Sequence, residues 1–172
     1  MLPELPPFEL NAFWISQILI GFALICDCIS WQCKNRKTIL VWLMGASSLI
    51  ATHFWVLGET TASLIVYLST LRFFISIFST HRYWLYAFLA AVFLIGITTY
   101  TKTTDLLVML ASSFTTYASF QPHDKKLRQW MMVGTSLWIG YDIIIFSPGA
   151  ALLESIFLIS NLVGYWRFYI RR

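Results

Sequence analysis

Three uncharged hydrogen-bonding residues lie inside long apolar stretches of the sequence: Gln17, Ser69 and Asn161. Amide and hydroxyl groups of this kind orient a small neutral or polar solute in an otherwise apolar pocket. The same groups also tie helices to one another in a membrane, where each contact contributes less than ~2 kcal/mol. We interpret the three residues as substrate-binding candidates and keep helix–helix contact as the alternative.

Four ionisable residues are candidates for a gate or an ion pair: His53, Arg72, Asp142 and Glu154. A charged residue near the bilayer centre costs about 2.5–3.5 kcal/mol on insertion scales, so each needs a physical reason. We expect His53, Asp142 and Glu154 near the outer ends of their helices, where solvation is the simpler interpretation. Arg72 lies deeper, and it either extends to the cytoplasmic face or pairs with Asp27 or with a helix carbonyl across the bundle. Asp27 itself is expected near the cytoplasmic end of the first span, close to the basic loop that follows.

Metal and catalytic chemistry find little support in the sequence. The three cysteines have the spacing C-x-C-x₄-C with no fourth ligand nearby, so we predict packing residues and no metal site. The H-E-x-x-H, G-x-S-x-G, G-x-G-x-x-G and P-loop patterns are absent from the sequence. We therefore assign no catalytic residue and no cofactor, and we predict that the protein is not an enzyme.

The composition indicates which elements must position these side chains. The 172 residues are 58% hydrophobic and 12% charged, whereas a soluble domain averages about 45–50% apolar and about 25% charged residues. Too few polar residues remain to cover a small globule of this kind. We predict an integral membrane protein whose main partner is the lipid bilayer, and we exclude a nucleic-acid partner.

Seven apolar runs approach the roughly 20 residues that a helix needs to cross the hydrocarbon core. Lipid-embedded backbone must form helices or a closed barrel, and the alternation of a barrel strand is missing from these runs. We therefore predict an all-α membrane protein with seven transmembrane helices. The expected spans are residues 12–30, 38–57, 60–79, 83–100, 104–120, 128–146 and 150–169.

The basic residues indicate the orientation of the spans. Ten of the twelve lysines and arginines lie in the loops after the first, third and fifth spans, at the start of the span that follows the fifth (Arg128), or at the C-terminal end of the chain. The opposite side carries only Lys102, and Arg72 lies within a span. Because cytoplasmic loops are enriched in lysine and arginine, we predict an N-terminus outside and a C-terminus in the cytoplasm.

A weak internal repeat divides the chain. Residues 30–47 resemble residues 119–136, and the offset of 89 also relates Gly45 to Gly134 and His53 to Asp142. An extra span between two three-helix units makes the units parallel in the membrane. We predict a 3+1+3 arrangement. It comprises an extracytoplasmic lead-in at 1–11, a first bundle at 12–79, a linker helix at 80–103 and a second bundle at 104–172 with a basic cytoplasmic end.

Several motifs in order along the chain resemble the YgjV-type bacterial inner-membrane proteins. The motifs are "WISQ" at 14, "HFWVLG" at 53, "DLLVMLASSFTTYASF" at 105 and "ESIFLISNLVGYWRF" at 154. That family is more remotely similar to the SWEET and PQ-loop transporters, which share the 3+1+3 plan with the N-terminus outside. The resemblance implies a bacterial inner membrane and a path for a small solute. One difference is that all five prolines lie outside the span interiors, whereas PQ-loop transporters use prolines inside the first helix of each triplet as hinges.

The two functional hypotheses are a transporter-like carrier of a small solute and a non-transporting membrane scaffold or partner-binding protein. Uncharged lining residues favour a neutral or polar solute for a carrier. Arg72, interpreted as the only charge at that depth, makes an anion the second choice. A wet polar centre would favour the carrier, and a dry, tightly packed centre would favour the scaffold. The sequence leaves a homo-oligomer open.

Overall fold

The computed structural model describes residues 7–171, with side chains from residue 14 onward. Over this range the chain forms seven α-helices and no strand. Each predicted span coincides with one helix, which confirms the all-helical fold class. The helices are α1 (Pro7–Gln32), α2 (Arg36–Val56), α3 (Thr60–Phe78), α4 (Arg82–Thr98), α5 (Thr104–Ser119), α6 (Asp124–Ile144) and α7 (Pro148–Tyr169).

The helix ends differ from the predicted ones where polar residues continue a helix. α1 begins at Pro7, within the predicted lead-in, whose first six residues lie outside the described range. α6 begins at Asp124, four residues before the apolar run starts, because its first turn is polar and charged. Asn35 fixes the start of α2, since its side chain accepts a hydrogen bond from the backbone nitrogen of Lys37 at 3.0 Å.

Four helices are long and apolar enough to cross a membrane: α2, α3, α7 and the part of α1 from Trp14 to Gln32. The apolar α4 is shorter, with 17 residues. α5 and α6 carry more polar side chains along their length. Membrane crossing by these last three helices stays a prediction.

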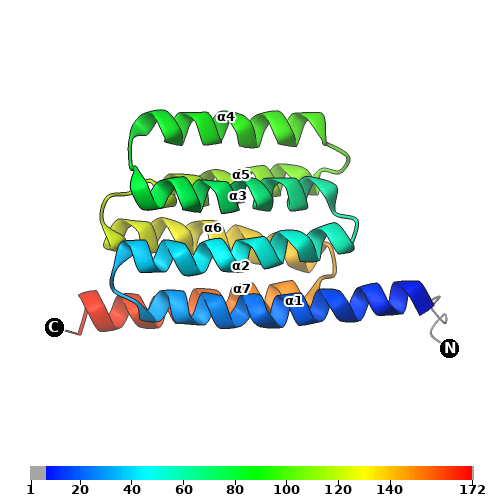
Figure 1. Ribbon diagram of the computed structural model, residues 1–172, viewed down its shortest axis with the longest axis horizontal. Helices are drawn as coiled ribbons and strands as arrows, with labels where there is room; N and C mark the ends of the chain where they lie inside the picture. The colour runs from blue at the N-terminus through cyan, green and yellow to red at the C-terminus, as the bar shows by residue number, and fades with distance from the viewer. Residues whose placement is uncertain (1–6, 172) are drawn as a thin grey trace.

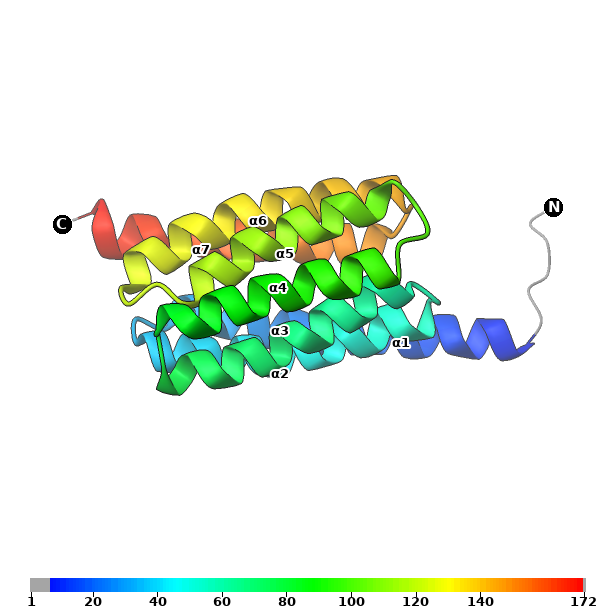
Figure 2. The same cartoon turned by 90° about the horizontal axis from the view of Figure 1, so that it is seen from above.

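Six of the helices form a closed ring (Figures 1 and 2). α2 packs between α1 and α3, α6 packs between α5 and α7, and the two groups meet where α1 contacts α7 and where α3 contacts α5. The order around the ring is therefore α1, α2, α3, α5, α6 and α7. α4 lies outside the ring, against α3 and α5.

Two apolar clusters fill the ring at different depths. The Phe54 cluster comprises Ala51, Phe54, Ala62, Ile65, Val66, Val92, Val108, Met109, Ala111, Trp138 and Tyr141. The Trp31 cluster comprises Trp31, Ile39, Leu40, Leu43, Phe73, Ala118, Leu127, Met131 and Phe157. The Phe54 cluster lies toward the N-terminal end of α1, and there Phe54 stacks on Trp138 with ring centroids 6.2 Å apart. The Trp31 cluster lies toward the C-terminal end of α1, and there Trp31 meets Phe157 edge-on at 5.1 Å. The first pair joins α2 to α6 across the ring, and the second joins the neighbouring helices α1 and α7. Such pairs contribute about 0.5–1.5 kcal/mol beyond the area they bury. The space between the two clusters is not filled by side chains, and it contains the candidate site.

The packing of α6 against α5 gives a first prediction. A Cβ atom on Gly134 would clash with the side-chain methyl of Thr115 and lie 3.2 Å from the carbonyl oxygen of Ala111. At Gly45, the matching position of the repeat, a Cβ would meet nothing within 4 Å. We expect Gly134→Ala to lower the free energy of unfolding by about 1–3 kcal/mol because it overpacks the contact. Gly45→Ala should leave that free energy unchanged or raise it by up to about 1 kcal/mol. Detergent unfolding curves of the two purified variants measure the difference, and equal destabilisation would contradict the close α5–α6 contact.

Candidate functional site

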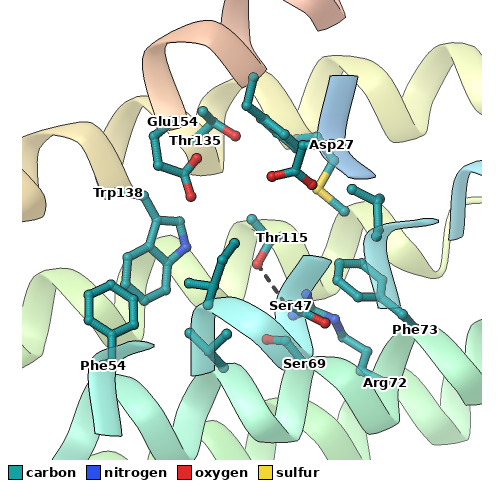
Figure 3. A pocket seen from close by; sticks show the side chains of 15 residues that line it. Asp27, Ser47, Phe54, Ser69, Arg72, Phe73, Thr115, Thr135, Trp138 and Glu154 are labelled. Carbon is teal, nitrogen blue, oxygen red and sulfur yellow. Dashed lines mark hydrogen bonds between the residues drawn. The ribbon is translucent and has the colours of Figure 1, made fainter. Parts of the chain in front are cut away.

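A cavity lies at the centre of the ring, between the Phe54 and Trp31 clusters (Figure 3). Residues of all six ring helices line it, and none of its lining residues belongs to α4. Its volume is about 70 Å³, counted as the space open to the centres of water molecules. That space holds roughly five water molecules, since one needs about 10–15 Å³. The cavity is therefore large enough for a small solute.

One wall of the cavity is acidic. Asp27 on α1 and Glu154 on the adjacent α7 both line the cavity, and Figure 3 shows their carboxyl groups directed into it. Asp27 is 2% exposed. Neither carboxyl group has a hydrogen bond or an ion pair with any described residue. Glu154 is partly buried. Polar groups enclosed in a protein are normally paired, so two unpaired acids that line one cavity indicate a place for a ligand or for water.

The opposite wall is basic. Arg72 on α3 is 2% exposed, and its Nη1 donates hydrogen bonds across to α5, to the hydroxyls of Thr116 at 2.6 Å and Thr115 at 3.3 Å and to the carbonyl oxygen of Ser112 at 3.4 Å. Nε and Nη2 have no hydrogen-bond partner among the described residues. Of the alternatives for Arg72, the structure contains the helix carbonyl across the bundle. It shows neither an ion pair with Asp27 nor an extension to the surface.

Hydroxyl and aromatic side chains complete the cavity. Ser47 on α2 shares a hydrogen bond of 2.9 Å with the hydroxyl of Thr70, and Ser69 on α3 donates to the carbonyl oxygen of Ile65 at 3.1 Å. Thr135 on α6 faces the same space, and Trp138 closes it on the side of the Phe54 cluster. These groups can accept or donate further hydrogen bonds, but only the three charged side chains give the cavity its electrostatic character.

The three predicted substrate-binding residues are not brought together. Ser69 lines the central cavity, whereas Gln17 lines a separate pocket beside the α6–α7 connection, with Ser147 and Gly149. Asn161 is fully buried, and its Nδ2 donates to the carbonyl oxygen of Arg128 at 3.0 Å, which is the helix–helix alternative. The central cavity is lined by Ser69 together with Arg72 of the same helix and with Asp27 of α1 and Glu154 of α7.

Two acidic residues lie elsewhere than expected. Asp27 does not meet the basic loop after α1 but faces the cavity, and Glu154 reaches the cavity instead of standing at the helix end. The expectation that Arg72 is the only charge at that depth is therefore wrong. His53 and Asp142 are both buried, and neither is among the residues that line the cavity. His53 Nδ1 lies 3.1 Å from the carbonyl oxygen of Ser16, while its Nε2 and both oxygens of Asp142 have no partner in the described part of the chain.

Two further arginines close helix ends rather than line the cavity. Arg36, the first residue of α2, donates to the carbonyl oxygens of Ser119 at 2.6 Å and Gln121 at 2.9 Å, at the end of α5. Arg128 in α6 donates in the same way to the carbonyl oxygen of Cys33 at 2.7 Å, just after the end of α1. The last carbonyls of a helix lack partners within the helix, so these contacts are structural and join one half of the ring to the other.

The comparisons with known proteins agree with this picture of a membrane protein. The family model of a bacterial inner membrane protein, Imp-YgjV, matches residues 14–172. The chain is 24% identical to the inner membrane protein YgjV of Escherichia coli strain K12 over 162 residues, which cover 92% of this chain and 88% of that protein. No solved structure matches the chain. The family match extends over nearly the whole chain, so this protein belongs to the YgjV family of multi-pass bacterial inner membrane proteins.

Proposed function

We propose that the protein is a carrier that moves a small solute across the bacterial inner membrane and binds it in the central cavity. The observation that supports this function is the set of three incompletely paired charged side chains that line the cavity: Asp27 and Arg72, which are buried, and Glu154, which is partly buried. A scaffold gains nothing from such groups, because unpaired charges in an apolar interior are costly. The site binds and releases a solute, and we assign it no chemical reaction.

The 3+1+3 arrangement is part of this proposal. A half-turn about the centre of the ring would exchange α1 with α5, α2 with α6 and α3 with α7, and it would map the α3–α5 contact onto the α7–α1 contact. Both contacts are present. The same pairing agrees with the offset of 89, which relates Arg72 on α3 to Asn161 on α7. Two halves related in this way could move against each other and open the cavity to either side.

The proposed orientation places the N-terminus of α1 outside and gives a second prediction. In a variant without the native cysteines, Phe146→Cys, at a position 90% exposed, should react with a membrane-impermeant maleimide in spheroplasts. Lys126→Cys, at the exposed start of α6, should react only after the membrane is opened. The two positions lie at opposite ends of α6, so they form a matched pair. Labelling of Lys126→Cys in sealed spheroplasts would reverse the proposed orientation.

Reconstitution tests the carrier function directly. Purified protein is screened by thermal shift against sugars, amino acids, organic acids and amines, and each compound that raises the melting temperature is tested for uptake into proteoliposomes. A carrier should accumulate a binding solute faster than protein-free liposomes do. Binding without uptake would identify a solute-binding membrane protein, and the absence of both across all four classes would favour the scaffold.

A further inference from the structure

The charges around the cavity are divided between two opposite walls. Asp27 and Glu154 come from α1 and α7, which are neighbours in the ring, and Arg72 comes from α3, which is paired with α5 on the other side. The internal repeat does not produce this division. The offset of 89 relates Asp27 to Thr116, which is uncharged and holds Arg72 Nη1 at 2.6 Å. The cavity is therefore polarised across the ring although its helices are arranged symmetrically.

The walls do not neutralise each other. No ion pair joins Arg72 to either acid in the described structure, and hydrogen-bonding capacity remains on both sides: the two carboxyl groups and the Nε and Nη2 atoms of Arg72. Charge-assisted hydrogen bonds to such groups are about twice as strong as neutral ones. A ligand with one charged end could satisfy only one wall. A ligand with a positive end and a negative end would satisfy both.

On this basis we infer that the cavity binds a small zwitterion, with its ammonium group between Asp27 and Glu154 and its carboxylate at Arg72. The inference rests on the proposed function, since it names the class of solute that the carrier takes. Two acids around the ammonium and one guanidinium at the carboxylate also match the donors and acceptors of the two groups. The hydroxyl of Ser69 lies beside Arg72 in Figure 3, and it could donate to the same carboxylate in place of its bond to the carbonyl oxygen of Ile65. The volume of about 70 Å³ restricts the ligand to a short chain.

Ligands of equal chain length and different charge test the class. Isothermal titration of the full-length protein compares β-alanine and 4-aminobutyrate with the diacids malonate and succinate. The same experiment includes the diamines 1,3-diaminopropane and putrescine and the diols 1,3-propanediol and 1,4-butanediol. Glycine is added as the shortest zwitterion. We expect at least one zwitterion to bind at least tenfold more tightly than the diacid, diamine and diol of its own length. If any of these three binds as tightly or more tightly, the inference that the ligand is a zwitterion is wrong, but the cavity is still a solute-binding site.

Variants of the acidic wall locate the ammonium group. In the wild type, β-alanine should bind better than propionate, which lacks the ammonium. Glu154→Gln should reduce the affinity for β-alanine at least tenfold, to the level of propionate, and leave propionate unchanged. Asp27→Asn should act in the same way, so the test survives if one variant fails to fold. Glu59→Gln is the control, because Glu59 is paired with Lys102 at 3.0 Å and does not line the central cavity.

The outcomes separate the inference from the proposed function. If β-alanine keeps its advantage over propionate in both acidic-wall variants, the ammonium does not lie at Asp27 and Glu154, and the inference is wrong. If no zwitterion binds but a sugar or another solute binds and is taken up by proteoliposomes, the proposed carrier function is supported and the inference that the ligand is a zwitterion is wrong. If nothing binds and nothing is taken up, both are overturned.

Discussion

Arg128→Ala is expected to lower the free energy of unfolding by about 3–5 kcal/mol. Arg128 is fully buried and donates two hydrogen bonds to the end of α1, from Nη1 to the carbonyl oxygen of Trp31 at 3.2 Å and from Nη2 to that of Cys33 at 2.7 Å. Hydrogen bonds from a charged donor contribute about 1.5–3 kcal/mol each, and the carbonyls left behind would be buried without partners. The guanidinium also packs closely against Gly164, where an added Cβ would lie 2.6 Å from Nη1.

Arg167→Ala is the matched control for this prediction. Arg167 also donates to a carbonyl at the end of α1, that of Gln32 at 3.1 Å, but it is exposed to solvent. An exposed charge exchanges this contact for water and contributes less than about 1 kcal/mol. Chemical unfolding of both variants in the same detergent gives the two values. A loss of similar size in both would show that burial of Arg128 does not determine the strength of the contact.

The helices could be predicted from the sequence because lipid imposes one simple requirement. Every membrane span needs a long apolar run, and each predicted run coincides with a helix of the structure. The helix ends are less predictable, because a helix continues for as long as its backbone is hydrogen-bonded. α1 extends back to Pro7 and α6 to Asp124, through polar residues that an apolar run does not include.

The residues of the cavity could be predicted only in part. A sequence indicates how far along a helix a residue lies better than it indicates what its side chain points toward. Glu154 and Asn161 are seven residues apart and share a helix face, but seven residues separate them by about 10 Å along the axis. Glu154 therefore reaches the cavity and Asn161 reaches the backbone of Arg128. Gln17 lies ten residues before Asp27, about 15 Å away along α1, which places it in another pocket.

The sequence raised Asp27 as a possible partner of Arg72 but not as a residue that lines the cavity, for a related reason. Distance from the end of its apolar run suggested a cytoplasmic position, yet α1 continues to Gln32 and leaves Asp27 more than one turn inside the helix. An available signal was the repeat itself, since the offset of 89 relates Asp27 to Thr116, the residue that contacts Arg72. The repeat would have placed Asp27 opposite Arg72, on the facing side of the ring. The position of a residue in a repeat indicates which way its side chain faces in the ring, whereas its distance from a helix end does not.

The two buried arginines, Arg72 and Arg128, should respond to substitution in opposite ways. Arg128 has both terminal nitrogens bound to helix-end carbonyls, so its removal damages the fold. Arg72 uses one nitrogen only, and its partner Thr115 also donates to the carbonyl oxygen of Ser112 at 3.1 Å, a bond that would remain without the arginine. An incompletely paired buried charge is itself costly, so an apolar side chain of similar length removes that cost together with the hydrogen bonds from Nη1.

Arg72→Met is therefore expected to change the free energy of unfolding by less than about 1 kcal/mol and to weaken zwitterion binding severely. Removal of one partner from a buried charge pair costs about 2–5 kcal/mol of binding free energy, which corresponds to a loss of at least roughly thirtyfold in affinity. Isothermal titration should show the wild type preferring β-alanine to n-propylamine, which lacks the carboxylate, and the variant binding both equally. Arg72→Lys, which keeps the charge but presents fewer donors, should retain part of the preference. If Arg72→Met instead loses as much stability as Arg128→Ala and keeps the preference for β-alanine, Arg72 is a structural residue like Arg128 and the carboxylate does not bind at its wall of the cavity.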